Sequence, residues 1–362
     1  MGTKDHPRFA VIGTGRMAAA MMSTFARAGV QVTAIVSRDL QRALTFANEF
    51  VIPNASNDLN TVLHSDGCDA VYIANASGDH AATAIAAMEA GKAVMCEKPL
   101  ALRLSDAERI TNVARRTGTL CMEGLWIAFL PAYRRFLDLA RAKMCGEPIH
   151  LSADFGYPVT EKAMTRLLSP TSGGVLLDRG VYLVALALDL FGPVETVEAK
   201  LNLTAQGLDH HASLQLGHRD GGQSQLAVSY AALMTNTASL ACFGGLLRLE
   251  EPLIGAEALS IRRFTSGNAA FDRGRPLSAK QKLMHALRQR SLLRRIKRAM
   301  PFVKREHLPY GGDPYLLQLR HFLFLLKQGT RESNIVPLEL SLNIQRVVEL
   351  ARTQNTDALL RP

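Results

Sequence analysis

The adjacent pair Glu97 and Lys98 suits acid–base chemistry. They follow the apolar run Val94 to Cys96, so a carboxylate and an ammonium lie directly after the carboxyl end of a predicted buried strand. Pro99 has a fixed φ and biases Lys98 toward an extended conformation, which aims the lysine instead of leading the chain straight into a helix. An isolated Glu–Lys pair is also compatible with a surface salt bridge that contributes almost nothing to stability. The elements around the pair decide between the two interpretations.

The first third of the chain alternates predicted strands and helices. Residues 8–37 read as an apolar strand, a glycine turn, an alanine-rich helix and a β-branched strand ending near Ser37. A later helix is expected to open at a capping box of Ser105 and Glu108 and to end at Gly118. The alternation predicts an α/β protein whose N-terminal part is a Rossmann fold, a doubly wound parallel sheet that binds ligands at the carboxyl ends of its strands. The other expected elements are helices over Leu40 to Phe50 and His80 to Ala90, and strands over Asp69 to Asn75, Ala93 to Cys96 and residues 119–123.

The turn between the first strand and the first helix is Gly13-Thr14-Gly15-Arg16-Met17-Ala18, a variant of GxGxxG. The first glycine permits a tight turn, the second lets the backbone approach a pyrophosphate, and the helix N-terminus supplies N–H groups and a positive dipole end. Its position at the start of the chain predicts dinucleotide binding by Gly13, Thr14, Gly15, Arg16 and Met17. The alternative is an ordinary glycine loop.

Ser37 and Arg38 stand where NAD-binding proteins usually carry an acidic residue for the ribose hydroxyls. A hydroxyl and a guanidinium bind a 2′-phosphate, whereas a carboxylate repels it. We therefore expect NADP as the cofactor, with NAD as the alternative, in which Arg38 is a solvated loop residue and Asp39 a helix cap. If the domain binds a nicotinamide cofactor, the strand ending at Cys96 lies at the edge of the sheet where the nicotinamide ring binds. Glu97 and Lys98 then face the reacting atoms.

Four segments resemble the glucose–fructose oxidoreductase / inositol dehydrogenase / MocA family in order and approximate spacing. They are the glycine turn, GKAVMCEKPLAL, MEGLWIAFLPA and RLLSPTSGGVLLDRGVY. The EGLW and DRGVY forms look most like the dihydrodiol dehydrogenase-like branch, and the likeness extends to GTRES at residues 329–333. The resemblance implies a hydride-transferring enzyme that acts on a sugar, a cyclitol or another cyclic alcohol or carbonyl compound.

The resemblance also implies roles for individual residues. Lys98 contacts both substrate and cofactor, Asp178 either orients Lys98 or bonds a substrate hydroxyl, and Tyr182 donates the proton. Asp178 and Tyr182 are four residues apart and share one face if they lie on a helix. A tyrosine with a pKa near 10 exchanges protons poorly unless a cation such as Lys98 lowers that pKa. Without the resemblance, a core aromatic residue is the better interpretation of Tyr182.

We further assign cofactor contacts to Asn75, His80, Glu97 and Trp126. The alternative for Trp126, the single tryptophan, is a core residue at the interface between the two domains. Two positions depart from the family pattern. Asn75-Ala76-Ser77 replaces a Thr-Pro-Asn/His sequence on the nicotinamide side. Arg179 replaces an apolar residue, which indicates either an anionic group on the substrate or a structural ion pair.

The bulk composition is that of a globular protein, with 362 residues, 48% of them hydrophobic and 20% charged. The length predicts two domains, which we place at residues 1–124 for NADP binding and 125–362 for substrate binding and dimerisation. The N-terminus has no apolar stretch after a basic start, and the longest apolar run, Val181 to Phe191, is too short to span a membrane. Five cysteines without CxxC spacing indicate neither a disulfide framework nor a metal site. A cytoplasmic location is the simplest expectation.

The second domain shows period-two strand patterns, which predict an α+β domain with a large, mostly antiparallel, open-faced sheet. GHRDGG has the composition of a hairpin turn between two of the strands, and helices around Tyr315 to Lys327 and Leu338 to Arg352 are expected to close the fold. The resemblance implies a homodimer through the open face of the sheet. The strand segments are IHLSADF, VETVEAKLNL, HHASLQL, QSQLAVSY and NTASLACFGGLLRLEE.

Residues 273–305 form a basic insertion with twelve Lys and Arg residues and no acid. Because the whole chain has a net charge of +10, the rest is close to neutral. Ser278 and Gln281 indicate the cap of a helix running to Met300, with two apolar stripes on different sides. Such an arm is suited to contact anionic lipid surfaces, dock an acidic partner or attract phosphorylated substrates. The alternative is a solvated helix that covers the edge of the domain. Nucleic acid is a poor match because aromatic residues are not interleaved with the charges.

Three functions remain open from the sequence. The first is an NADP-dependent oxidoreductase acting on a CH–OH group of a cyclic substrate. The second is a redox-neutral glycosidase with tightly bound NAD, against which Ser37-Arg38 and the tyrosine form of the motif speak. The third is a non-catalytic cofactor-sensing protein, against which the retention of Lys98, Asp178 and Tyr182 speaks.

Overall fold

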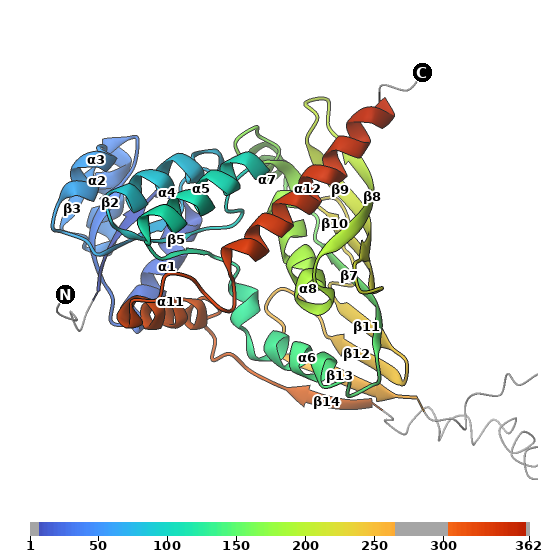
Figure 1. Cartoon of the computed structure of the whole chain (residues 1–362). Helices are drawn as coiled ribbons and strands as arrows, with labels where there is room; N and C mark the ends of the chain where they lie inside the picture. Colours follow the sequence, from blue (N-terminus) through green and yellow to red (C-terminus); the bar gives the residue numbers. More distant parts are fainter. Residues whose placement is uncertain (1–6, 265–302, 360–362) are drawn as a thin grey trace, which may run out of the picture.

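The computed structural model describes residues 7–264 and 303–359, which form two sheets with helices packed against them (Figure 1). The first sheet has six parallel strands in the order β3-β2-β1-β4-β5-β6. The strand order reverses between β1 and β4, which is the point where ligands bind in such sheets. The strands are β1 (Arg8–Ile12), β2 (Gln31–Val36), β3 (Asn54–Ser56), β4 (Ala70–Ile73), β5 (Ala93–Cys96) and β6 (Cys121–Glu123); the helices are α1 (Arg16–Arg27), α2 (Leu40–Phe50), α3 (Leu59–His64), α4 (His80–Glu89) and α5 (Leu104–Thr117), with a 3-10 turn, η1 (Ser77–Asp79).

The strands of this sheet are apolar throughout because both faces are covered. Phe9 and Val11 of β1 point to one face and Ala10 and Ile12 to the other, and the two sets belong to two separate hydrophobic clusters. The helices α4 and α5 lie over one face of the sheet (Figure 1). This arrangement confirms the predicted Rossmann fold.

The second sheet has eight strands in the order β14-β13-β12-β11-β7-β10-β9-β8. Only β7 and β10 pair in parallel, and the other neighbours are antiparallel. The large, mostly antiparallel sheet is thus confirmed, including the hairpin at residues 217–222. Helices α6 and α8 pack on one face. The elements are η2 (Trp126–Phe129), α6 (Pro131–Arg141), β7 (Pro148–Gly156), α7 (Glu161–Leu167), η3 (Leu176–Gly180), α8 (Val181–Phe191), β8 (Val194–Leu203), β9 (Asp209–His218), β10 (Gln223–Ser229), β11 (Ala238–Cys242), β12 (Gly245–Leu249), β13 (Ala258–Arg263) and β14 (Val303–His307).

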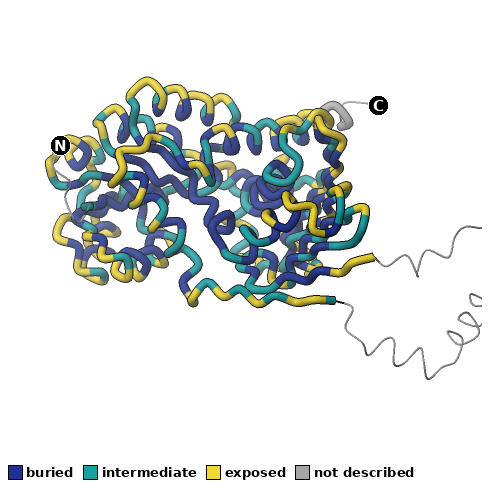
Figure 2. Tube along the Cα trace, turned by 60° about the horizontal axis from the view of Figure 1, so that its bottom comes forward, coloured by how far each residue is buried: buried dark blue, intermediate teal, exposed yellow. Residues whose placement is uncertain are grey.

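The C-terminal helices α11 (Leu316–Gln328) and α12 (Leu338–Leu359) join the two halves. Phe322 of α11 packs edge-on against Phe9 of β1, with 5.9 Å between ring centroids. Gln345 of α12 donates a buried hydrogen bond of 2.8 Å to the carbonyl of Ala101. Buried residues run along the strands and the inner sides of the helices, whereas exposed residues lie on the outer helical faces and loops (Figure 2). Among the described residues, none of the helices combines the length and hydrophobicity needed to cross a lipid bilayer.

Three expectations about elements differ from the structure. The capping box is wrong, because α5 begins at Leu104 with Arg103 as N-cap and no side-chain cap, so Ser105 is already inside the first turn. The basic insertion ends earlier than residue 305, since Lys304 and Arg305 belong to strand β14. The helix expected between Ser278 and Met300 lies outside the described residues. Asp178 and Tyr182 do not share one regular helix, because Asp178 sits in the π-helical turn η3 that leads into α8.

Candidate active site

A cavity of about 1310 Å³ opens at the carboxyl ends of the parallel strands and is walled by both domains. This volume exceeds the roughly 300–1,000 Å³ of a pocket for one small ligand. All residues that the sequence assigned to catalysis or cofactor binding line it. They are Gly13, Thr14, Gly15, Arg16, Met17, Ser37, Arg38, Asn75, His80, Glu97, Lys98, Trp126, Asp178 and Tyr182.

The glycine turn brings backbone close to strand β4. Gly13 has a φ of +110°, and a Cβ there would lie 2.6 Å from the carbonyl oxygen of Ala74, so only glycine fits. Gly15 is the N-cap of α1 and provides no side-chain cap for its first N–H groups. Those N–H groups and the positive end of the dipole are a site for an anion, which fits the pyrophosphate of a dinucleotide.

Two guanidinium groups flank the end of β2. The Arg38 side chain is 87% exposed, and its Nη1 lies 3.4 Å from Asp79 Oδ2, a contact of little strength at such exposure. Arg42 of α2 also lines the cavity, although the sequence had not singled it out. Asp39 caps α2 by accepting a 2.9 Å hydrogen bond from Gln41 N, so its carboxylate points back at the helix.

Lys98 is held by Asp178. Its Nζ donates hydrogen bonds of 2.7 Å to Asp178 Oδ1 and of 2.7 Å to the Asp178 carbonyl, and Tyr230 donates a 3.0 Å bond to Asp178 Oδ2. Burial alone would lower the pKa of Lys98, but the negative charge of Asp178 outweighs burial and raises that pKa. For Asp178 burial acts to raise the pKa, and the attraction of Lys98 leaves it lowered. Both groups are therefore charged at neutral pH, and the geometry matches the orienting role expected for Asp178.

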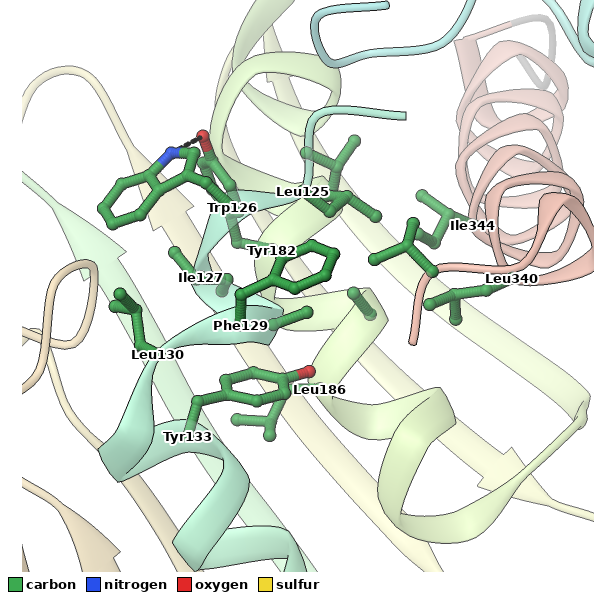
Figure 3. Packing of buried hydrophobic residues seen from close by; sticks show 14 of the residues in the cluster. Leu125, Trp126, Ile127, Phe129, Leu130, Tyr133, Tyr182, Leu186, Leu340 and Ile344 are labelled. Atoms are coloured by element: carbon green, nitrogen blue, oxygen red, sulfur yellow. Dashed lines mark hydrogen bonds between the residues drawn. The ribbon is translucent and has the colours of Figure 1, made fainter. Parts of the chain in front are cut away.

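Tyr182 lies beside this pair, with Lys98 Nζ 5.1 Å from the centre of its ring. Its hydroxyl accepts a 3.1 Å hydrogen bond from Trp126 Nε1 (Figure 3). Burial raises the pKa of Tyr182, and the nearby Lys98 lowers it only in part. The expectation that Lys98 brings this pKa below its ordinary value is thus wrong, because desolvation of the phenolate outweighs a charge already shared with Asp178. Tyr182 carries its proton at neutral pH.

Three predicted cofactor residues line the cavity but make hydrogen bonds within the Rossmann domain. Glu97 Oε1 accepts a 2.7 Å bond from the hydroxyl of Tyr72, and Asn75 Nδ2 donates a 2.9 Å bond to Thr83 Oγ1. His80 Nδ1 donates a 2.8 Å bond to the carbonyl of Pro99, and burial lowers the pKa of His80. Of these side chains, His80 thus fixes the loop that carries Lys98.

Glu123 supports the same loop from the interior and was missed as a functional residue. Its Oε1 accepts a 2.7 Å hydrogen bond from the backbone N–H of Leu100, two residues after Lys98. Burial raises the pKa of Glu123 to about 7. The sequence signal was an acidic residue at the end of a predicted buried strand, where a charge needs a structural or chemical reason.

Arg179 lines the cavity, and among the described residues its hydrogen bonds go to carbonyl groups and not to an ion partner. Nη1 donates a 2.9 Å hydrogen bond to the carbonyl of Tyr157 and a second bond to the carbonyl of Ser229. The guanidinium also stacks 5.0 Å from the ring of Phe155 and 4.8 Å from that of Tyr230. It therefore ties the ends of β7 and β10 together through carbonyls and aromatic rings instead of an ion pair.

One wall of the cavity, next to Tyr182, carries apolar and aromatic side chains. Trp126 packs against Tyr315 with ring centroids 5.3 Å apart, and Phe155, Val159 and Ile254 complete the wall. Except for Trp126, these residues were not predicted, because apolar side chains on separate strands and loops carry no local signal of a binding site. Only the fold brings them together.

Comparison with known proteins assigns the family. The sequence model for an oxidoreductase family with an NAD-binding Rossmann fold matches residues 7–125, and the model for the GFO/IDH/MocA C-terminal domain matches residues 133–247. The chain belongs to the Gfo/Idh/MocA oxidoreductase family. The resemblance inferred from the motifs is thereby confirmed, and residues 7–125 form a nicotinamide-cofactor domain.

Several proteins similar to this Gfo/Idh/MocA chain are dihydrodiol dehydrogenases. The mouse trans-1,2-dihydrobenzene-1,2-diol dehydrogenase is 24% identical over 350 residues, which is 95% of this chain and 96% of that protein. The Xenopus tropicalis enzyme of the same name is 29% identical over 230 residues, 63% of this chain and 69% of that protein. Among solved structures, KijD10, a 3-ketoreductase from Actinomadura kijaniata in complex with NADP and TDP-benzene, superposes with a TM-score of 0.78 at 25% identity, covering 96% of this chain and 98% of that chain.

Proposed function

We propose that the protein is an NADP-dependent oxidoreductase acting on a CH–OH group, or on the corresponding carbonyl, of a cyclic substrate. The observation that carries the proposal is that Lys98 contacts both Asp178 and Tyr182. All three residues line the same cavity as the glycine turn. A nicotinamide cofactor bound there supplies or accepts the hydride. Solved structures of KijD10 include variants at one lysine and at one tyrosine, separated by the same number of residues as Lys98 and Tyr182.

The proton of the reaction resides on Tyr182. In the reducing direction the new alkoxide takes the phenolic proton, which the raised pKa of Tyr182 keeps in place until substrate arrives. The resulting phenolate is stabilised by the Lys98 ammonium and by the Trp126 N–H, which already points at the hydroxyl. Asp178 acts through Lys98 by fixing its position.

The apolar wall favours a ring substrate with few oxygens. Lys98, Asp178 and Tyr182 already have partners, and Arg179 is bound to backbone carbonyls. Trp126 and Tyr315 offer aromatic faces on which a ring can stack. A cyclic vicinal diol or its hydroxy-ketone is therefore our preferred substrate class.

We expect NADPH to bind more tightly than NADH because of Arg38. Replacing Arg38 by alanine should weaken NADPH binding about 10- to 100-fold through loss of a charge-assisted hydrogen bond to the 2′-phosphate, and leave NADH binding nearly unchanged. Quenching of Trp126, the single tryptophan and a cavity residue, reports the titration. Arg116→Ala, which removes another exposed arginine paired with Glu89, is the matched control. Wild-type protein that preferred NADH would contradict the NADP assignment.

We propose a homodimer through the open face of the large sheet. One row of paired residues crosses this face, with Glu198 at one end, small or amide side chains in the middle and arginines toward the other end. Stacking two copies antiparallel brings the acidic end of each row to the basic end of the other. The row is Glu198, Gln215, Gln225, Ser152, Ser239, Arg248, Ser260 and Arg305.

The dimer predicts a molar mass of twice 39.5 kDa by light scattering. Ser152→Arg, at the middle of the row, should shift the mass to that of a single chain because two arginines would meet at the interface. A wild-type protein that is monomeric at micromolar concentration would rule the dimer out. The five cysteines are all unpaired, which suits the reducing cytoplasm that we propose as its location and that cell fractionation would check.

A further inference from the structure

An exposed apolar patch lies at the end of the large sheet farthest from the active site. We define the hairpin patch as Met144, Phe243 and Phe264, which are 38%, 83% and 55% exposed. Phe243 is in the turn between β11 and β12, Phe264 follows β13, and Met144 precedes β7.

Two backbone hydrogen bonds and one side-chain contact hold the three residues in one place. The backbone N–H of Phe264 donates a 2.7 Å hydrogen bond to Gly244, next to Phe243. The backbone N–H of Phe243 donates a 2.9 Å bond to the carbonyl of Glu147, and the Arg263 guanidinium contacts Met144 Sδ. Two exposed phenylalanines thus lie at the same end of neighbouring strands, and exposed apolar patches are typical of interaction sites.

The charge around the hairpin patch is positive. Arg262 and Arg263 are exposed on β13 immediately before Phe264. Lys143 is also exposed, and its Nζ lies 2.6 Å from the carboxylate of Glu147. Glu147, whose carbonyl accepts the hydrogen bond from Phe243, is an acidic residue next to the patch. An aromatic centre with a basic rim is the chemistry of surfaces that insert between anionic lipid headgroups.

The basic segment of the sequence is attached at this corner at both ends. The chain leaves the described residues after Phe264 and returns at Val303, which pairs with Arg262 in the β13–β14 register. Between them, residues 265–302 hold ten Lys and Arg residues and one acid, Asp272. These charges have the sign that anionic lipids attract.

We propose that the hairpin patch docks the enzyme on membranes rich in anionic lipid, with Phe243 and Phe264 entering the headgroup layer. The alternative occupant, a second copy of the chain, is disfavoured because two such corners would bring together the exposed Arg262 and Arg263 of each copy. The proposal is independent of the catalytic assignment, since none of the patch residues lines the cavity.

The test is sedimentation of the full-length protein with vesicles of phosphatidylcholine alone or with roughly one-third phosphatidylserine. We expect binding to the anionic vesicles only, weakened as salt is raised. The double variant Phe243→Ser, Phe264→Ser should reduce vesicle binding by at least about tenfold, because it removes the two aromatic side chains that move from water into the lipid layer on binding. Phe324→Ser removes an equally exposed phenylalanine (58%) from α11 and should bind like wild type.

Three results would overturn the proposal. They are no binding to anionic vesicles at low salt, undiminished binding of the double variant, and a wild-type dimer that the double variant converts to monomers. The last result would show that a second copy covers the patch. Cofactor binding by the double variant, followed through Trp126, verifies that it is folded.

Discussion

Replacing Lys98 by methionine is expected to lower kcat by roughly a thousandfold while NADPH affinity stays within a few-fold. Methionine keeps the apolar stem of the side chain but removes the ammonium that lies 5.1 Å from the Tyr182 ring. Without it, the phenolate formed on Tyr182 has lost its nearest cation in a site where burial already disfavours that charge. The comparison is made by steady-state kinetics and by quenching of Trp126.

Two further measurements make the Lys98 result unambiguous. Lys98→Met also leaves Asp178 buried without its ion partner, although Tyr230 still donates to Asp178 at 3.0 Å. Retained NADPH binding shows that the variant is folded, and Lys98→Arg, which keeps the charge, should recover part of the activity. Turnover of Lys98→Met at the wild-type rate would remove Lys98 from the catalytic machinery.

Replacing Tyr182 by phenylalanine should lower kcat by about 10²- to 10⁴-fold, the range for loss of a general acid. The ring and its packing survive, but the proton donor is gone and the Trp126 N–H loses its acceptor. Because burial raises the pKa of Tyr182, the wild-type reduction should show no loss of rate from tyrosine ionisation between neutral and mildly alkaline pH.

Tyr133→Phe is the matched control for Tyr182→Phe. Tyr133 is also buried and its hydroxyl donates a 2.7 Å hydrogen bond to Asp189, but it does not line the cavity. Both variants lose one buried hydroxyl contact and therefore similar stability, about 1–3 kcal/mol. Equal activity of the two variants would show that the effect at Tyr182 is structural.

Local patterns predicted the parts of the fold in which one segment decides its own structure. The glycine turn between strand and helix is such a case, because the φ of Gly13 and the start of α1 at Arg16 follow from neighbouring residues. The position of Lys98 after β5 is another. These elements also carry the cofactor and catalytic assignments, which is why all the candidate residues line one cavity.

The sequence patterns did not predict which distant segments contact one another. The hydroxyl that meets Glu97 comes from Tyr72, and the wall beside Trp126 comes from Tyr315, nearly 190 residues later. The orientation of Arg179 depends on carbonyls of two strands that pair only in the folded sheet. Periodicity shows which side of an element is buried, but not which other element buries it.

Hydride transfer is measured directly by following deuterium from the carbinol carbon of a cyclic vicinal diol to NADP. We expect stoichiometric NADPH with the label recovered in the reduced cofactor, and label transfer roughly a thousandfold slower with Lys98→Met. Tight NADP binding without transfer from any diol or hydroxy-ketone would contradict the proposed function and favour a cofactor sensor. Release of a free sugar from a glycoside with no net change in the cofactor would contradict it in favour of the glycosidase.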